Sequence, residues 1–223
     1  MCMETGRYTV KRLSGWLLLV CLLLGLSRPG MAEQGPVEVL QAMTDSLIDI
    51  VEQDPDVVHN MARLRAIAGE VVLPRVDFNA MSRWVLGKYW RTATPQQRVA
   101  FIVEFREMLL GTYLRSVSSH KGHGVRYLPI RGDLQKGRTM VHVEVDQPDG
   151  PVVHVMFRMR RVGSTWLIYD VVVEGISLVA THRTSFSREI HNSGMDSLIA
   201  RLHARNMSRA EEEAAAGLET AGG

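Results

Sequence analysis

The stretch Val141-His-Val-Glu-Val-Asp-Gln-Pro-Asp-Gly-Pro-Val-Val-His-Val-Met-Phe-Arg-Met159 decides the fold class of this chain. Apolar residues alternate with polar ones on both sides of Pro-Asp-Gly-Pro, which is the pattern of two half-buried antiparallel strands joined by a turn. A three-residue loop places Val145 opposite Val153 and keeps one face of the hairpin apolar. A two-residue turn would reverse the parity of the second strand, so we favour the three-residue loop.

Segments on either side of this hairpin complete the fold prediction. A strand opens at Val125 and Tyr127, and a fourth strand runs from Trp166 to Val173. The helical spacing of apolar residues, with caps and prolines at the ends, predicts helices at about 36–53, 58–74, 78–89, 95–117, 177–192 and 195–205. Helices before and after four adjacent strands indicate an α+β fold. We therefore expect a four-stranded antiparallel curved sheet, covered by helices on one face and enclosing an apolar cavity.

The helix predicted at 95–117 is apolar over most of its circumference. It begins with Thr94-Pro-Gln-Gln97, which supplies an N-cap, a proline at the first position and a capping box. By the helical period, one side carries Phe101, Phe105 and Met108. The far side carries Val103, Leu110 and Leu114. Such a helix must be covered on two sides, by the sheet on one and by more protein or another apolar group on the other.

Residues 1–32 have the features of a secretory signal peptide. Three basic residues precede the apolar run Leu13–Leu26, and Gly30-Met-Ala32 offers small residues before a cleavage site. The run is too short to span a bilayer. We therefore expect an exported, periplasmic protein that begins at Glu33, with one α+β domain at 33–207. The Ala-, Glu- and Gly-rich segment 208–223 is expected to be a disordered acidic tail.

Composition excludes several classes of function. The chain has 223 residues, of which 46% are apolar and 22% are charged, as is usual for a globular protein. Removing the leader, which carries a formal charge of +3, changes the net charge from +2 to −1. Such a domain has no general attraction for nucleic acid. Both cysteines, Cys2 and Cys21, lie in the leader, so we expect no disulfide, thiol nucleophile or cysteine-bound metal in the exported chain.

Two groups of residues invite a catalytic interpretation. In the favoured register Glu144 faces His154 and His142 lies two positions along, which could form a three-ligand metal site. An exposed strand face with alternating charge explains the same pattern, and we favour it. Asp170 and Glu174 could form a carboxylate pair for acid–base chemistry, but Asp170 more simply bonds the backbone at a strand end. No motif for a nucleophile, a phosphate loop or a dinucleotide cofactor is present. We therefore expect no catalytic residues, no metal and no cofactor.

Methionine is the unusual feature of the apolar composition. The chain has 12 methionines, and all but Met1, Met3 and Met31 lie beyond the predicted leader. Methionine fills irregular apolar space and adapts to varied ligands. A methionine-tolerant core explains the number equally well when it is taken alone. Together with the two-sided helix at 95–117, it favours a ligand pocket.

Several spaced segments resemble one known family. They are Val72-Leu-Pro-Arg-Val-Asp-Phe-Asn-Ala-Met-Ser-Arg-Trp-Val-Leu-Gly-Lys-Tyr-Trp-Arg-Thr-Ala-Thr-Pro-Gln-Gln-Arg98, Trp166-Leu-Ile-Tyr-Asp170, Val173-Glu-Gly-Ile-Ser-Leu178 and Gly194-Met-Asp-Ser-Leu198. In this order they resemble the MlaC family of periplasmic phospholipid-binding proteins, also called the toluene-tolerance family. The resemblance covers about residues 33–207.

The resemblance implies a lipid carrier. Members of the family shuttle phospholipid across the periplasm between an outer-membrane lipoprotein complex and an inner-membrane ABC transporter with an MCE-domain subunit, which maintains outer-membrane lipid asymmetry. Related members occur with hopanoid-synthesis genes, so the lipid class stays open. The family fold is α+β, with acyl chains held between the sheet and the helices. A metal-dependent lipid-modifying enzyme and an adaptor without ligand are the alternatives.

Periodicity, and not the family motif, supplies the candidate lining of the lipid cavity. A cavity for two acyl chains should reach the upper part of the range of about 300–1,000 Å³ that is usual for ligand pockets. The candidates are the apolar positions on the Phe face of the long helix, on the helix before it and on the sheet. They are Val85, Tyr89, Phe101, Phe105, Met108, Leu109, Val143, Val155 and Val172.

Overall fold

The alternating stretch forms the two longest strands of an antiparallel sheet. In the computed structural model, which describes residues 34–118, 124–130, 133–147 and 150–221, β2 (Arg138–Gln147) pairs with β3 (Gly150–Val162). Val145 lies opposite Val153, as predicted. The predicted three-residue loop is wrong, because Gln147 pairs directly with Gly150 and leaves only two residues between the strands. A β-bulge between Val145 and Gln147 restores the parity that the longer loop was expected to provide.

The sheet has five strands, in the order β1-β2-β3-β4-β5, where four were predicted. Strand β1 is Val125–Tyr127, β4 is Thr165–Val173 and β5 is Ile176–Ser177. All neighbours are antiparallel. The fifth strand is only two residues long, so it carries no alternating pattern that sequence analysis could detect. The turn before it uses Glu174 and Gly175, both with positive φ.

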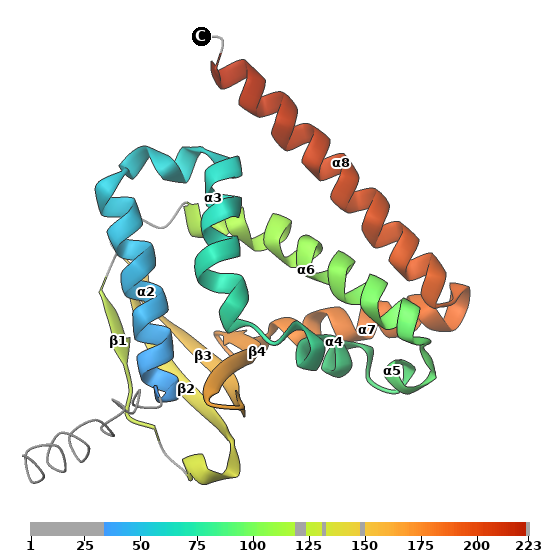
Figure 1. The fold of residues 1–223 in the computed structure, drawn as a ribbon, viewed down its shortest axis with the longest axis horizontal. Helices are drawn as coiled ribbons and strands as arrows, with labels where there is room; N and C mark the ends of the chain where they lie inside the picture. The colour runs from blue at the N-terminus through green and yellow to red at the C-terminus, as the bar shows by residue number, and fades with distance from the viewer. Residues whose placement is uncertain (1–33, 119–123, 131–132, 148–149, 222–223) are drawn as a thin grey trace, which may run out of the picture. The chain divides into compact units, whose positions relative to one another are not determined.

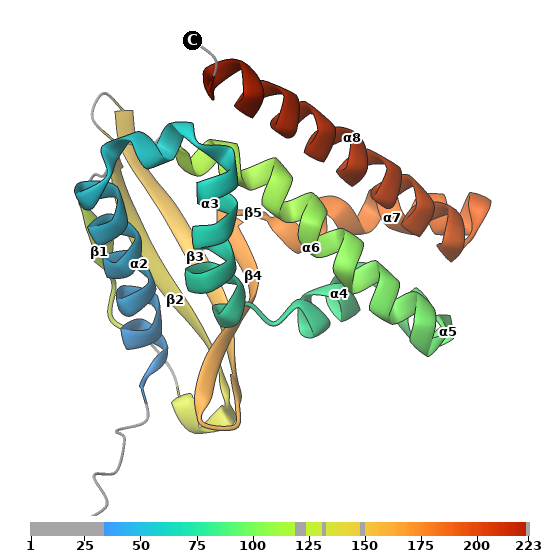
Figure 2. The same ribbon diagram turned by 45° about the horizontal axis from the view of Figure 1, so that its top comes forward.

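Helices precede and follow the sheet, as expected for an α+β fold. In chain order they are α2 (Pro36–Gln53), the 3-10 helix η1 (Pro55–His59), α3 (Met61–Ile67), the π-helix η2 (Ala68–Val72), the 3-10 helix η3 (Leu73–Arg75), α4 (Phe78–Leu86), α5 (Tyr89–Thr92), α6 (Pro95–Ser118), the 3-10 helix η4 (Leu134–Lys136), α7 (Leu178–Ser193) and α8 (Met195–Ala221). Helices α2 and α3 lie over one face of the curved sheet, and α4 to α8 lie on the side of β4 (Figures 1 and 2).

Local signals explain where several helices begin and end. The capping box at the start of α6 is confirmed, because Thr94 Oγ1 accepts a hydrogen bond from Gln97 N and Gln97 Oε1 accepts one from Thr94 N. The helix predicted at 78–89 is divided into α4 and α5 at Gly87, whose φ is +55°. The helix predicted at 58–74 is a series of short 3-10, α and π segments.

The C-terminal segment corrects a further prediction. Residues 208–223 were expected to form a disordered tail, but α8 continues without a break through Ala221. Ala and Glu dominate this segment and both are strong helix formers, so its composition suits a helix as well as a solvated tail. Figure 1 shows α8 running beside α6 over part of its length. The predicted signal peptide at 1–32 lies outside the described residues.

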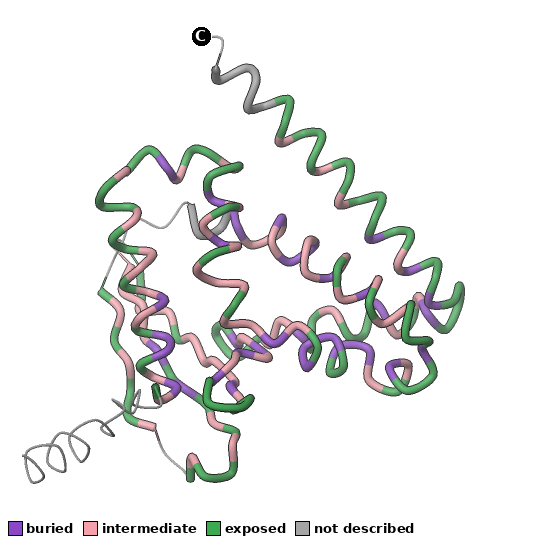
Figure 3. The backbone as a smooth tube through the Cα atoms, viewed as in Figure 1, coloured by how far each residue is buried: buried purple, intermediate pink, exposed green. Residues whose placement is uncertain are grey.

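The two larger apolar clusters hold most of the fold together. In the first, Leu40 and Met43 of α2 pack against Val141 and Met159 of the sheet. In the second, residues of α4, α6, α7 and α8 pack together without the sheet. Figure 3 shows buried positions recurring along α4, α6 and α7 at helical intervals. Among the described helices, none combines the length and the hydrophobicity needed to cross a membrane.

Candidate functional site

An apolar cavity of about 230 Å³ lies where α3, η2, α6 and the helix-covered face of the sheet meet. Its lining residues are all aliphatic or aromatic. They are Leu47, Leu64, Ile67, Ala68, Val72, Leu73, Val76, Phe78, Met81, Leu109, Leu110, Tyr113, Leu114, Val171 and Leu178. The cavity is smaller than the sequence analysis predicted for a site that holds two complete acyl chains.

The cavity has a closed side where α3 and η2 meet α6. Leu64 and Ala68 pack there against Leu114, and Leu110 is partly buried against the same three residues. Most other lining side chains are only half-buried, because part of their apolar surface faces the cavity. Contents that cover this apolar surface would remove it from water, which is worth about 25 cal/mol per Å². Apolar contents would therefore stabilise the protein.

The cavity offers no charged group to a ligand. Among its described lining residues, Tyr113 alone carries a polar side-chain atom. Burial raises the pKa of the Tyr113 hydroxyl above its ordinary value of 10.0, so this group stays neutral at physiological pH. A lining of this kind can hold hydrocarbon, but it provides neither a nucleophile nor an acid–base pair for catalysis.

Of the nine residues predicted to line a lipid site, Leu109 lines this cavity. Val85, Phe101, Phe105 and Met108 lie instead in the cluster formed by α4, α6, α7 and α8. The side of α6 that faces the cavity carries Leu110, Tyr113 and Leu114 beside Leu109. Both sides of α6 are apolar, and the helical period alone does not say which neighbour each side meets.

Aromatic packing fills the Phe face of α6. The rings of Phe101 and Phe105 are stacked with centroids 5.3 Å apart. Each meets Phe186 of α7 edge to face at 5.9 Å. Phe101 and Phe105 have at most 1% of their surface exposed, and the predicted site residue Tyr89 packs half-buried against the same cluster. In this structure these side chains pack as core.

The three predicted sheet residues also lie away from the cavity. Val143 and Val155 pack in the cluster between α2 and the sheet. Val172 lies opposite Met156 on the other face of the sheet. All three border a separate hollow of about 220 Å³, whose further lining residues are Leu128, His142, His154, Met156 and Gly175. The alternation along the strands marked these valines as inward-facing positions, but it does not say which helix lies beside each of them.

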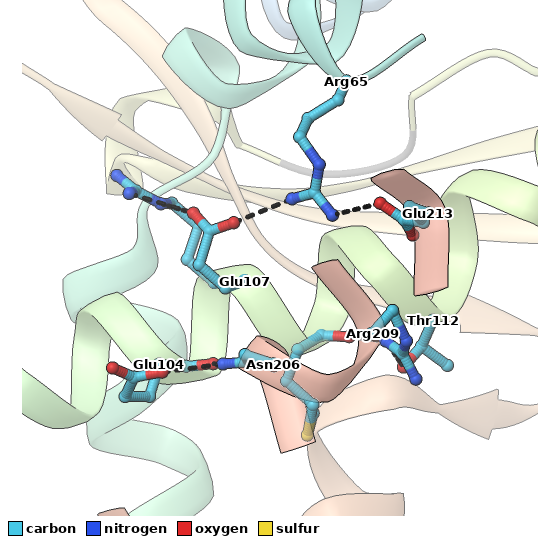
Figure 4. Close-up of polar contacts among 9 residues, drawn as sticks. Arg65, Glu104, Glu107, Thr112, Asn206, Arg209 and Glu213 are labelled. Atoms are coloured by element: carbon cyan, nitrogen blue, oxygen red, sulfur yellow. Dashed lines mark hydrogen bonds and ion pairs between the residues drawn. The ribbon is translucent and has the colours of Figure 1, made fainter. Parts of the chain in front are cut away.

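Polar contacts tie the cavity wall α3 to its neighbours (Figure 4). Arg65 of α3 donates hydrogen bonds to Glu107 of α6 at 2.8 Å and to Glu213 of α8 at 3.0 Å. Asn206 of α8 donates to the backbone oxygen of Glu104 at 3.0 Å and to its carboxylate at 2.8 Å. The C-terminal half of α8 is therefore part of the structure that positions the wall.

The histidine face of the sheet is not arranged as a metal site. His154 Nδ1 lies 3.8 Å from Glu144 Oε1, and Glu144 also pairs with Arg126 at 3.2 Å. Within the described ranges, no three His, Cys, Asp or Glu side chains gather closely enough to hold a metal ion. The contacts match an exposed strand face with paired charges.

Asp170 and Glu174 make structural bonds. Asp170 is 2% exposed and accepts hydrogen bonds from the backbone N–H of Val179 at 3.2 Å and from Ser177 Oγ at 2.7 Å. Arg158 adds an ion pair at 3.2 Å. The prediction that Asp170 bonds the backbone is confirmed. Glu174 accepts a bond from the backbone N–H of His154. These bonds fix the start of α7 and the end of β4.

Comparison with known proteins finds relatives along most of the chain. The family model described as "MlaC protein" matches residues 41–204. The "Toluene tolerance protein ttg2D" of Pseudomonas putida is 26% identical over 180 residues, which cover 80% of this chain and 83% of that protein. The "Intermembrane phospholipid transport system binding protein MlaC" of Haemophilus influenzae is 22% identical over 201 residues, which cover 86% and 92%.

A similar fold is also found among solved structures. The phospholipid-binding protein from Ralstonia solanacearum, solved in complex with a phospholipid, superposes with a TM-score of 0.71. The two chains are 24% identical, and the match covers 77% of this chain and 97% of that one. The helices and the antiparallel sheet described above are therefore arranged as in that protein.

Proposed function

The chain belongs to the MlaC family, and on this premise we propose that it is a phospholipid-binding transport protein that holds acyl chains in the apolar cavity. The observation that carries the proposal is the lining of that cavity, which is aliphatic and aromatic throughout and lies between helices and sheet. The name of the Haemophilus influenzae relative and the ligand of the Ralstonia solanacearum structure support phospholipid as the ligand.

Burial of hydrocarbon supplies the binding energy. Each buried methylene contributes about 0.8 kcal/mol, so a lipid with two acyl chains has almost no free aqueous monomer. A carrier must therefore offer the chains an apolar surrounding and leave the headgroup in water. The cavity of about 230 Å³ accommodates part of such a ligand. Complete loading requires the cavity to widen.

The wall formed by α3 and η2 is the part that moves in this proposal. It consists of short helical segments, and η2 is a π-helix, a conformation that is frequent at functional sites. Moving this wall away from α6 would separate Leu64 from Leu114 and break the bonds that Arg65 makes. The wall then closes again when the lipid leaves.

The wider role proposed for the protein is transport through the periplasm. The signal peptide predicted at 1–32 and the family membership support export to that compartment. In this role the protein exchanges phospholipid with an inner-membrane MCE-domain ABC transporter and an outer-membrane lipoprotein complex, and so helps to maintain outer-membrane lipid asymmetry. In this role the lipid is carried and not changed.

Extraction of lipid from the purified exported protein, followed by mass spectrometry, tests the proposal. The variant Leu110→Trp adds bulk inside the cavity, and Val99→Trp adds the same bulk at a position of α6 that is 63% exposed. We expect intact phospholipid with the unmodified protein and with Val99→Trp, and much less with Leu110→Trp. If a hopanoid is extracted in place of phospholipid, the cavity binds that class of lipid instead. Absence of lipid, or equal lipid in all three proteins, would contradict the proposed site.

A further inference from the structure

A small hollow with three arginines lies between α4 and the strands β2, β3 and β4. Its volume is about 50 Å³, which suits a small polar group and not an acyl chain. It shares no lining residue with the apolar cavity. Its lining residues are Ala80, Arg83, Trp84, Arg138, Arg160 and Tyr169.

The charges in this hollow are only partly compensated. Arg138 lies directly opposite Arg160 in the β2–β3 register, and like charges in this position repel each other. Asp77 compensates one of them, since its Oδ2 accepts a hydrogen bond from Arg160 Nε at 2.5 Å. The other oxygen of Asp77 caps α4 by accepting from Ala80 N at 2.8 Å. Among the described residues, Arg83 and Arg138 form no ion pair with a carboxylate.

The segment of the chain that carries Arg83 is basic, and an exposed tryptophan borders the hollow. No Asp or Glu occurs between Asp77 and Glu104, although this segment contains three other basic residues besides Arg83. The indole of Trp84 stacks on Tyr169 with ring centroids 6.0 Å apart, and 46% of the Trp84 surface stays exposed. An exposed tryptophan beside arginines suits the boundary between lipid headgroups and water.

We propose that this hollow binds a phosphate-type oxyanion. Guanidinium groups present planar pairs of N–H donors that match the oxygens of a phosphate, and such charge-assisted bonds are strong. An anion held between Arg138 and Arg160 would also remove the repulsion between them. The phosphate can come from a lipid headgroup at a bilayer surface or from free phosphate in solution. The site goes beyond the proposed transport function, and it stands or falls independently of the apolar cavity.

Thermal unfolding in phosphate tests the shared chemistry. The variant Arg138→Gln removes one arginine of the hollow, and Arg188→Gln removes an exposed arginine of α7 that does not line it. We expect inorganic phosphate to raise the Tm of the unmodified protein and of Arg188→Gln above the value in chloride at equal ionic strength. The rise should be absent in Arg138→Gln, while its Tm in chloride stays at or above that of the unmodified protein.

Flotation with vesicles separates the two sources of phosphate. The vesicles contain either phosphatidylglycerol and phosphatidylcholine or phosphatidylcholine alone, at 0.15 M salt (about physiological ionic strength). Binding to the anionic vesicles that falls several-fold in Arg138→Gln, and not in Arg188→Gln, assigns the site to lipid headgroups. A Tm rise that depends on Arg138, without vesicle binding, assigns it to soluble phosphate. If neither readout depends on Arg138, or if both variants lose binding equally, the proposal is overturned.

Discussion

Arg65 and Glu213 form an ion pair between positions that lie 148 residues apart in the sequence, with Arg65 Nη2 at 3.0 Å from Glu213 Oε2. The pair joins α3, which carries the cavity residues Leu64 and Ile67, to the C-terminal half of α8. Glu213 lies beyond residue 204, where the match to the family model ends. The segment of this chain beyond that match therefore braces a wall of the cavity.

Removing the charge of Glu213 should loosen that wall. The Glu213 side chain is 10% exposed and that of Arg65 is 33% exposed, so we expect Glu213→Gln to cost about 1 kcal/mol of unfolding free energy. Transfer of a fluorescent phospholipid from the protein to vesicles should become faster, because α3 separates from α6 more easily. Stopped-flow fluorescence measures the transfer rate. Glu211→Gln, at an exposed position of the same helix, serves as the control. Equal rates for the two variants would show that the brace does not control opening.

Truncating the Phe face of α6 should damage the fold more than ligand binding. Phe105 is 1% exposed and packs against Phe101 and Phe186, so Phe105→Ala should cost about 3–5 kcal/mol. The lipid that remains bound per folded protein should change little, because this side chain does not line the cavity. Urea unfolding and lipid extraction measure the two quantities. A stable protein that has lost its lipid would place the acyl chains on the Phe face instead.

His182 should make the fold less stable in mild acid. Its ring stacks on Phe186 at 5.5 Å, and its Nε2 is buried without a hydrogen-bond partner. Burial, and secondarily the charge of Arg205, lowers the pKa of His182 below its ordinary value of 6.5. The folded state therefore holds the neutral ring, and the unfolded state binds the proton first as the pH falls. Stability should decline as the pH drops below about 6.5 and level off once the folded state also takes up the proton.

The variant His182→Gln isolates this contribution. Its urea midpoint should fall less between pH 7 and pH 5 than that of the unmodified protein, since one titrating group is gone. His191→Gln changes an exposed histidine of the same helix and should keep the full pH dependence. A pH dependence that is the same in all three proteins would mean that His182 titrates normally in the folded state.

Sequence periodicity predicted the sheet well, because the alternation of apolar and polar residues also determines which residues of two paired strands lie opposite each other. Val145 can face Val153 only if the apolar residues of both strands lie on one side, so the register followed even though a β-bulge replaced the predicted loop. The same reasoning misses β5, which has two residues and therefore no period. It also treats the segment 58–74 as one helix, because it does not detect 3-10 and π segments, which do not share the α-helical spacing.

The position of the apolar cavity was harder to predict than the fold, because periodicity does not identify the neighbour of an apolar residue. The apolar positions Leu64, Ile67 and Ala68 follow a helical spacing in the sequence, but that spacing does not say whether they meet a core or a cavity. On α6 the choice between the Phe face and Leu110 depends on where α7 and α8 pack. The ion pair between Arg65 and Glu213 joins parts of the chain that are distant in sequence. The composition of the Ala- and Glu-rich segment around Glu213 does not indicate which helix that segment contacts.

Photo-crosslinking of a bound phospholipid tests most directly whether acyl chains occupy the apolar cavity. The phospholipid carries a photoactivatable group at the end of one acyl chain, and trypsin then cuts the protein at Arg and Lys. Cleavage separates residues 107–115, which include the cavity residues Leu110 and Tyr113, from residues 99–106, which include Phe101 and Phe105. We expect crosslinks in 107–115 and in 66–75, the peptide of the opposite wall. Crosslinks confined to 99–106 would contradict the cavity as the lipid site.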